Sequence, residues 1–276
     1  MSDTLLMRIV KHLGLAVILV WSLGPVAFII LSSLKPAGQI FNYPPSLVFV
    51  PTFENYRALW TEFGDFFPAL RNSVIVAVGA TVIATVVSFM AGYVYSRYSG
   101  PLVARSALYM IAVRLLPPIV VTLPLFPMID FFGLSDTHIV LIVLYAAFWV
   151  SLVTIMLKTF IDEVPKELDE AAEMDGASQL QILLRVILPL AAQGIAAGAI
   201  FVFIYSWNEF LFALIFTTSN AKTAPLVISE VMDAIYGTSW GVLFAGVTVQ
   251  ILPVVLLVIL ANRLIVAGLT SGAVKG

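Results

Sequence analysis

Long apolar stretches alternate along this chain with shorter segments that carry most of its charge. Six stretches approach or exceed the roughly 20 residues that a helix needs to cross a membrane, at 13–34, 72–96, 106–129, 138–157, 186–208 and 240–262. Backbone groups in lipid need partners within their own segment, so we expect these stretches to be helices. The sequence shows none of the short alternating strands of a membrane barrel. The pattern predicts an all-α integral membrane protein with six transmembrane helices.

Glycine and proline occur within several of the predicted spans. A proline inside a helix removes a backbone hydrogen bond and clashes with the preceding turn. Neighbouring helices satisfy the freed groups in a membrane bundle, so such residues are tolerated there. We expect kinks at Gly24-Pro25, Pro117-Pro118, Pro124, Pro189 and Pro253.

The first apolar stretch has some features of a secretion signal, since Arg8 and Lys11 precede it. Its uncharged run from Leu13 to Leu34 is 22 residues long. The apolar core of a signal peptide has about 7–15 residues and is followed by a small-residue cleavage site, which does not occur here. The sequence therefore predicts that 1–34 is a retained transmembrane helix that acts as a signal anchor.

The distribution of lysine and arginine predicts the orientation, because these residues accumulate in cytoplasmic loops. With the N-terminus inside, nine of them fall inside and four outside, while Arg114 lies within the third span. The inside set is Arg8, Lys11, Arg97, Arg105, Lys158, Lys166, Arg185, Arg263 and Lys275, and the outside set is Lys35, Arg57, Arg71 and Lys222. Both termini and the segment 158–185 are therefore predicted to be cytoplasmic.

Two longer segments are predicted outside the cell membrane. The first, 35–70, is rich in proline and aromatic residues, and we expect one short helix near Glu54–Trp60. The second, 214–238, contains Thr217-Thr218-Ser219-Asn220 and is either a contact for a soluble partner or a plain connector.

Composition supports the membrane assignment and excludes several classes of protein. The chain is 61% hydrophobic and 11% charged, with a mean hydropathy of +1.05. It has no cysteine, which excludes disulfides and thiolate sites, and its net charge of −2 offers no basic surface for nucleic acid. The two histidines, His12 and His138, are far apart, so we expect no metal site and no catalytic residues.

The predicted cytoplasmic segment 158–185 concentrates the acidic residues of the chain. It holds seven of the sixteen: Asp162, Glu163, Glu167, Asp169, Glu170, Glu173 and Asp175. Pro165 suits the first position of a helix, and Gly176 is placed to end it. Ser178 and Gln181 have the spacing of a capping box that starts a second helix. The segment therefore predicts two short helices around a bend.

One face of the first of these helices is predicted to be nearly flat. Leu168, Ala171, Ala172 and Asp175 recur at helical spacing, and the alanines would let another surface approach closely. From the residues alone two interpretations remain open: a solvated connector between spans, or a docking site for a soluble partner.

Motif spacing adds a resemblance to a known family. Glu170-Ala171-Ala172, three residues, Gly176, nine residues and then Val186-Ile187-Leu188-Pro189 resembles the cytoplasmic signature of ABC importer permeases, with Val186 where isoleucine is usual. Phe132–Thr137 and Ser206–Phe210 resemble elements of the carbohydrate branch of that family. The ending 268–276 is similar to that of the shorter permease subunit of maltose-type importers. Together these matches extend from about Asn72 to the end.

The resemblance implies a type I ABC importer permease fold and a specific mode of coupling. It divides the chain into the first helix, the outer loop 35–70, a permease core over 71–263 and a cytoplasmic tail over 264–276. The core would couple to a cytoplasmic ATPase through 158–185, with Glu170, Ala171, Ala172, Asp175 and Gly176 as the coupling residues.

The same resemblance implies the partners and the location. These are a second homologous permease, two ATPase subunits, an extracytoplasmic substrate-binding protein and the lipid of a bacterial or archaeal inner membrane. The chain contains no phosphate-binding G-x-x-x-x-G-K-[ST] sequence, so ATP and magnesium are expected on the ATPase subunits, with no cofactor in this chain.

Six polar or aromatic residues in the spans are candidates for the translocation pathway: Arg114, Tyr205, Trp207, Asn208, Glu209 and Gln250. An ionisable group within a span is costly and marks function by default, although Arg114 could also extend towards an interface. Glu209 is a possible partner for Arg114. Tyr205 and Trp207 also suit an interfacial belt, and Gln250 suits an interhelical hydrogen bond.

The function expected from these features is a permease subunit of an ATP-driven importer for a carbohydrate or a carbohydrate derivative, forming half of the pathway. The alternatives are a permease of the same superfamily for a polyol, glycerol phosphate or amino acid, and a stand-alone channel or secondary transporter. A membrane enzyme is disfavoured because the sequence lacks a Ser–His or paired-His arrangement.

Overall fold

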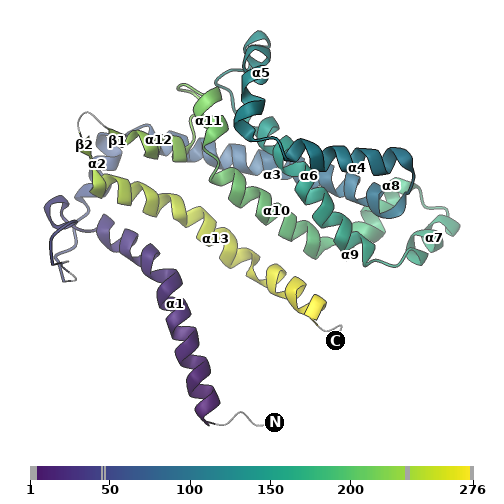
Figure 1. Cartoon of the computed structure of the whole chain (residues 1–276), viewed down its shortest axis with the longest axis horizontal. Coiled ribbons are helices and arrows are strands. Elements are labelled where there is room, and N and C mark those ends of the chain that lie inside the picture. Colours follow the sequence, from purple (N-terminus) through teal and green to yellow (C-terminus); the bar gives the residue numbers. More distant parts are fainter. Residues whose placement is uncertain (1–4, 45, 47, 234–236, 274–276) are drawn as a thin grey trace. The chain divides into compact units, whose positions relative to one another are not determined.

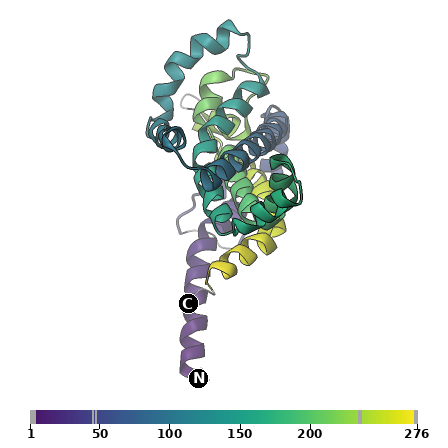
Figure 2. The ribbon, with the colours of Figure 1, turned by 90° about the vertical axis from the view of Figure 1, so that its right-hand side faces the viewer.

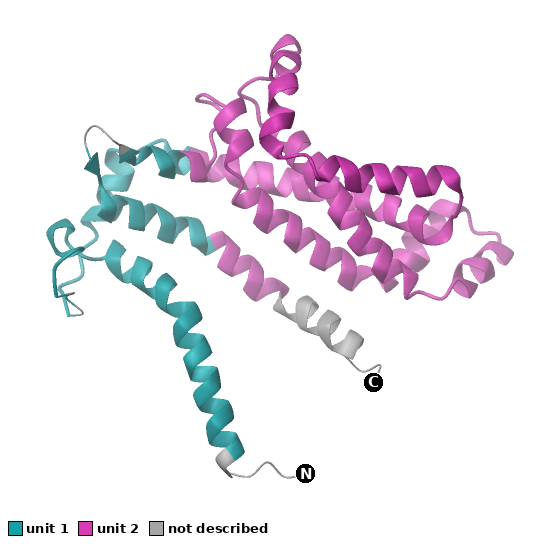
Figure 3. Ribbon diagram, in the orientation of Figure 1, with its two compact units in different colours: residues 1–68, 227–252 teal, residues 69–226, 253–276 magenta. Residues whose placement is uncertain are grey.

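Helices account for nearly all regular structure in the computed structural model, which describes residues 5–44, 46, 48–233 and 237–273, with side chains between 7 and 261 apart from 45, 47 and 233–236 (Figure 1). The chain forms two compact units, Met1–Pro68 with Val227–Leu252, and Ala69–Leu226 with Pro253–Gly276 (Figure 3). Helices α3 (Phe66–Arg97), α12 (Ala224–Glu230) and α13 (Trp240–Ala273) each contribute to both.

The first unit contains α1 (Leu5–Ser33), the 3-10 helix η1 (Ala37–Gln39), α2 (Glu54–Thr61) and the first part of α13. Strands β1 (Met232–Asp233) and β2 (Gly237–Thr238) pair antiparallel, with Met232 opposite Thr238. The buried amide of Asn55 donates to the backbone oxygens of Ser33 and Lys35, both at 2.8 Å. Helix α2 confirms the short helix predicted in the outer segment, and Asn55 joins it to the end of α1.

The second unit is built around α6 (His138–Asp162). It also contains α4 (Pro101–Arg114), α5 (Pro118–Phe131), α7 (Glu167–Met174), α8 (Gln179–Ile182), the π-helix η2 (Leu183–Ile187), α9 (Leu188–Leu190), α10 (Ala192–Trp207) and α11 (Leu211–Phe216). One buried cluster joins the first half of α6, through Leu141 and Tyr145, to α3 and α11. A second joins its last half, through Val153 and Leu157, to η2 and α10.

Four helices are long and apolar enough to cross a membrane, and they overlap the predicted first, second, fourth and sixth spans: Met7–Ser33, Phe66–Arg97, His138–Asp162 and Trp240–Ala261. The predicted third and fifth spans fall on two bent helix pairs, which raise the number of candidate spans in the described residues to six if each pair is one span.

The predicted third span is broken at its adjacent prolines. Helices α4 and α5 meet at 96°, and their directions differ clearly when the molecule is turned (Figure 2). Pro117 is extended, with φ −60° and ψ 136°, and Pro118 is the first residue of α5. A residue that precedes proline is driven out of the helical region, and proline has no N–H for the ladder. The predicted kink is therefore a sharp break.

The predicted fifth span, 186–208, begins in a different helix from the one in which it ends. Gln179–Leu190 forms one continuous piece that meets α10 at 81°. Residues 186–190, including Pro189, thus belong to the preceding helix, contrary to the prediction. The remaining 16 residues of α10 extend about 24 Å at 1.5 Å per residue.

The last helix is longer than the predicted span. Helix α13 continues to Ala273 and so includes most of the predicted tail 264–276. Residues 274–276 lie outside the described residues.

Candidate functional site

Helix α7 is the first of the two helices in the predicted cytoplasmic segment. Glu167, Asp169 and Glu170 lie in its first turn, where carboxylates complement the positive end of the helix dipole. Pro165 lies two residues before Glu167 rather than at the first helical position, and its carbonyl accepts the N–H of Leu168 at 3.3 Å.

Gly176 ends α7 in the way that the sequence predicts. Its φ is +84°, in the left-handed region that glycine favours. The N–H of Gly176 donates to the carbonyl of Glu173 at 2.9 Å, and the N–H of Ala177 donates to that of Ala172 at 3.0 Å. This pair of bonds is a Schellman motif, which satisfies the last carbonyls of a helix. The expected helix end at Gly176 is confirmed.

The second helix begins with the expected capping box. The Ser178 hydroxyl accepts the N–H of Gln181 at 3.4 Å, and the Gln181 side chain accepts the N–H of Ser178 at 2.7 Å. These reciprocal bonds satisfy two donors that a helix start would otherwise leave open. The chain therefore has the predicted helix–bend–helix unit, which continues through η2 and α9.

The coupling candidates lie on two sides of α7. Glu170, Ala171, Asp175 and Gly176 are exposed, but Ala172 is half-buried against the cluster that packs α6 on η2. The flat face predicted from Leu168, Ala171, Ala172 and Asp175 is therefore not exposed as a whole, because Ala172 faces the rest of the unit. Leu168 and Met174, 42% and 88% exposed, extend the apolar part of the outer side instead.

Asp169 anchors α7 to the end of α3, a role that was not predicted from the sequence. Its carboxylate is buried and forms an ion pair with Arg97 at the end of α3, with Nε 2.8 Å from Oδ2. In the sequence, Asp169 is one of several acidic residues in its segment, and Arg97 is one of several basic residues predicted to be cytoplasmic. The available signal was the position of Asp169 beside Ala172 on one side of the helix.

Arg114 ends α4 directly before the break. Its guanidinium lies 5.2 Å from the ring centroid of Trp149 and 5.9 Å from that of Phe148, both on α6. Its Nη1 is buried and makes no hydrogen bond to any described residue. The cation is thus held by aromatic faces, and the structure shows no pairing with Glu209, the possible partner.

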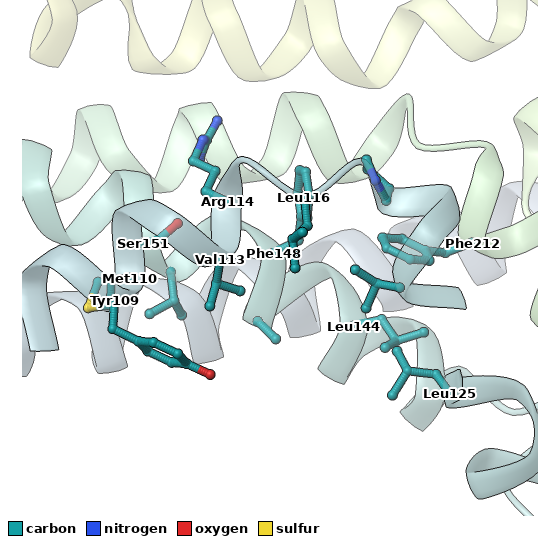
Figure 4. A pocket seen from close by; sticks show the side chains of 14 residues that line it. Tyr109, Met110, Val113, Arg114, Leu116, Leu125, Leu144, Phe148, Ser151 and Phe212 are labelled. Carbon is teal, nitrogen blue, oxygen red and sulfur yellow. The ribbon is translucent and has the colours of Figure 1, made fainter. Parts of the chain in front are cut away.

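A cavity of about 260 Å³ lies beside Arg114, between α4, α5, α6 and α11 (Figure 4). Val113, Leu125, Leu144 and Phe212 give it an apolar lining, and Arg114 is the charged residue among those that line it. The cavity places one cation next to a mostly apolar space within the second unit.

The candidates at the end of α10 are divided among different roles. Tyr205 is 48% exposed and packs its ring 4.7 Å from that of Trp149 and 4.4 Å from that of Phe201. Trp207 is buried and stacks on Phe203 at 5.7 Å. Tyr205 therefore belongs to the aromatic group beside Arg114, whereas Trp207 is part of the packing of the unit.

The next two candidates make local bonds. Asn208 donates to the carbonyl of Ile204 at 2.7 Å. Glu209 accepts the N–H groups of Phe212 and Ala213 at 3.0 and 3.4 Å, which caps the start of α11. Gln250 is half-buried in α13, in the part that belongs to the first unit.

The segment after α11 is tied down by a carboxylate. Asp136, with a φ of 57°, accepts the backbone N–H groups of Thr218, Ser219, Asn220 and Ala221 at 2.9–3.3 Å. Burial raises the pKa of Asp136, but these four donors outweigh it and hold the pKa well below its usual range. Residues 217–221 therefore have a fixed conformation, which the sequence left open.

Comparison with known proteins decides the family. Residues 84–270 match the family described as the inner membrane component of binding-protein-dependent transport systems, and so include α6, the α7 segment and α10. The chain belongs to this family. It is therefore a multi-pass membrane permease of the ABC importer class.

Relatives of this permease match it over nearly their whole length. The trehalose transport system permease protein SugB of Mycobacterium tuberculosis is 39% identical over 93% of both chains. The trehalose/maltose transport system permease protein MalG of Thermococcus litoralis is 33% identical over the full length of both.

Solved structures confirm the predicted fold class. A bacterial ABC transporter involved in the import of the acidic polysaccharide alginate contains a chain with a TM-score of 0.76, at 18% identity, covering 94% of this permease and 96% of that chain. At that identity the likeness shows the fold alone, which is that of an ABC importer permease.

Proposed function

We propose that this permease forms half of the translocation pathway of an ATP-driven importer for a carbohydrate or a carbohydrate derivative. The observation that carries the proposal is the outer side of α7, where Glu170, Ala171 and Asp175 are exposed next to the fixed bend at Gly176. The names of the trehalose and trehalose/maltose relatives support the cargo class.

Helix α7 supplies the contact with a separate ATPase. The exposed apolar side chains of Leu168, Ala171 and Met174 offer an edge for a cleft on a partner protein. Glu170 beside them can pair with a basic group there. Ala172 acts from the other side by letting α7 pack closely on its own unit. Gly176 fixes the direction in which the chain leaves the contact.

The aromatic group beside Arg114 supplies a candidate for the pathway. Sugars bind to proteins through stacking on aromatic faces and hydrogen bonds to hydroxyls, and Tyr205, Trp149 and Arg114 offer these groups within one cluster. The open Nη1 of Arg114 is a donor with no acceptor among the described residues. Glu209 and Trp207 support this region by capping and packing, and Asn208 and Gln250 stay candidates for the pathway.

The complete importer contains further subunits. We infer a second homologous permease, two ATPase subunits that bind ATP and magnesium, and an extracytoplasmic substrate-binding protein, all at the inner membrane of a bacterium or archaeon. This chain itself would then bind no cofactor and catalyse no reaction.

One alternative cargo has a specific observation in its favour. Arg114 is the charged residue that lines the cavity next to the aromatic group, and a single cation suits a negatively charged cargo such as glycerol phosphate. Direct transport measurements separate the two cargo classes.

The test is purification of the tagged permease from its native membrane in mild detergent, followed by reconstitution of the complex in proteoliposomes. We expect an ATPase to co-purify in stoichiometric amount, and radiolabelled trehalose or maltose to enter only with ATP and the binding protein. Uptake of glycerol 3-phosphate alone would establish the alternative cargo. Uptake without ATP and without an ATPase subunit would show a secondary transporter and overturn the proposal.

A further inference from the structure

Arg97, the last residue of α3, connects three segments of the second unit. Its Nε and Nη2 donate to Asp169 of α7 at 2.8 and 3.5 Å. Its Nη1 donates to the carbonyl of Ile161 at 3.2 Å, and its Nη2 donates to that of Val164 at 3.0 Å. One guanidinium thus joins the end of α3, the end of α6 and the first turn of α7.

The ion pair is buried, which makes it costly unless it is fully bonded. The side chains of Arg97 and Asp169 are only 7% and 11% exposed. A buried charge is retained only where partners replace the water that it loses, and removal of one partner leaves the other uncompensated. The flat, forked guanidinium reaches a carboxylate and two carbonyls at once, which the point charge of a lysine does not.

Helix α7 depends on this contact more than on apolar packing. Of its eight residues, all of them described, Asp169 is the only one that is buried. The half-buried Ala172 adds one small methyl group to the adjacent cluster. Because α7 is exposed and is held mainly through the Asp169 carboxylate, we expect it to move with the end of α3, which bonds that carboxylate.

A second set of bonds joins the same segments. The Tyr93 hydroxyl, one turn before Arg97 on α3, lies 3.3 Å from Asp169 Oδ2 and 3.2 Å from Gln179 Oε1. The Tyr98 hydroxyl donates to the same Gln179 oxygen at 3.3 Å, and Gln179 donates to Glu173. Both helices of the bend are therefore bonded to the end of α3.

We propose that Arg97 is a positioning residue that makes α7 and the adjacent end of α3 move as one rigid body during the transport cycle. The inference rests on the proposed coupling of α7 to an ATPase. A push on α7 would reach α3 through the Arg97–Asp169 pair. Helix α3 has 32 residues, about 48 Å at 1.5 Å per residue, so the movement would be carried along the length of a whole span.

The first experiment measures the ATP hydrolysed per sugar imported by the purified complex in proteoliposomes. Each of the substitutions Arg97→Gln and Asp169→Asn removes the ion pair that links α7 to α3 and leaves one buried charge without its partner. We therefore expect the ratio of ATP hydrolysed to sugar imported to rise about tenfold. The double variant should be no worse than either single variant, and Arg97→Lys should be intermediate. Arg105→Gln, an exposed arginine on α4, is the matched control and should keep the ratio. A purely structural role would lower the amount of complex without changing the ratio, and would overturn the proposal.

The second experiment keeps Arg97 and Asp169 in place, so it does not depend on the folding of the Arg97 and Asp169 variants. Because the chain has no cysteine, spin labels can be placed at Val94→Cys on α3 and Glu167→Cys on α7, both exposed. In the wild-type background we expect the same distance distribution without nucleotide and with ATP and vanadate. A shift between these states would show that α7 swings relative to α3, and would refute the rigid connection. Failure of the proposed function is distinguishable, because it appears earlier as the absence of an ATPase from the purified complex.

Discussion

Asp136 shows how a single side chain fixes a segment more than eighty positions away along the chain. Its carboxylate accepts four successive backbone N–H groups and the hydroxyls of Thr218 and Ser219. A second tie lies next to it, where Asn72 donates to the carbonyls of Asn220 and Lys222 at 2.9 and 3.0 Å. Nε2 of His138 lies 2.8 Å from the Asn72 oxygen. The conformation of 217–222 therefore depends on a few polar residues.

The Asp136 contacts should depend on pH in one direction. The pKa of Asp136 is lowered on folding, so its contribution is present above the unfolded value of about 3.9 and is lost as the pH falls through the folded value. We expect Asp136→Asn to speed hydrogen exchange at residues 218–221 at pH 7, and the difference from the wild type to shrink below about pH 4. Asp130→Asn, an exposed neighbour, is the control. An effect of equal size at all pH values would show that the negative charge is unimportant.

Substitution of Arg114 tests whether the aromatic group of Trp149 and Tyr205 belongs to the translocation pathway. Its guanidinium lies over Trp149 with an open Nη1, so its removal costs a donor and a cation near the cavity. We expect Arg114→Gln to reduce uptake of labelled sugar about tenfold, because the substitution removes a desolvated cation–π contact and the charged donor that is open to a hydroxyl of the cargo. Arg114→Lys should keep part of the activity, and Arg105→Gln all of it. Loss of uptake in strict proportion to loss of assembled complex would instead mark Arg114 as structural.

At the scale of the helices, two glycines set the distance between α10 and α6. A Cβ added at Gly198 would lie 2.9 Å from Cγ1 of Val153, and one at Gly194 would overlap the ring of Phe160. The spacing of four residues places both glycines on one face, as in close helix pairs of membrane proteins. Backbones can approach there only because no side chain intervenes.

Substitution at this contact should therefore weaken the bundle. We expect Gly198→Val to destabilise the protein by about 1–3 kcal/mol, the usual cost of overpacking, seen as a lower unfolding temperature in detergent. Gly14→Val in α1 is the control, because nothing lies within 4 Å of its added Cβ. An equal change in both variants would attribute the effect to glycine content rather than to the contact.

The helices also show which parts of the fold the sequence can predict. Uninterrupted apolar runs identify α3 and α6 because length and hydropathy are local properties. They do not show that Gln179–Leu190 runs at 81° to α10, because hydropathy is the same whether an apolar segment crosses or turns. The prolines at 117 and 118 indicate a kink, but they do not indicate that the helices they separate meet at 96°.

At the scale of the whole molecule, the candidate site also has features that the sequence predicts and features that it does not. Capping residues such as Ser178 and Gly176 act on their own neighbours, so the bend was predictable. The side of α7 that faces outward was not, because it is set by Arg97, 72 positions before Asp169 in the chain. Long-range pairs of this kind need the fold before they can be recognised.

The orientation in the membrane connects the site to its energy source. Nine lysines and arginines against four predict that α7 lies in the cytoplasm and α2 outside, and the proposed ATPase contact requires it. Single cysteines can report this directly, since the chain has none. We expect a membrane-impermeant maleimide to label Glu62→Cys, which is exposed after α2, in intact spheroplasts. Glu167→Cys should react only after the membrane is opened. The reverse pattern would place α7 away from ATP, and the coupling proposed for this helix would then be impossible.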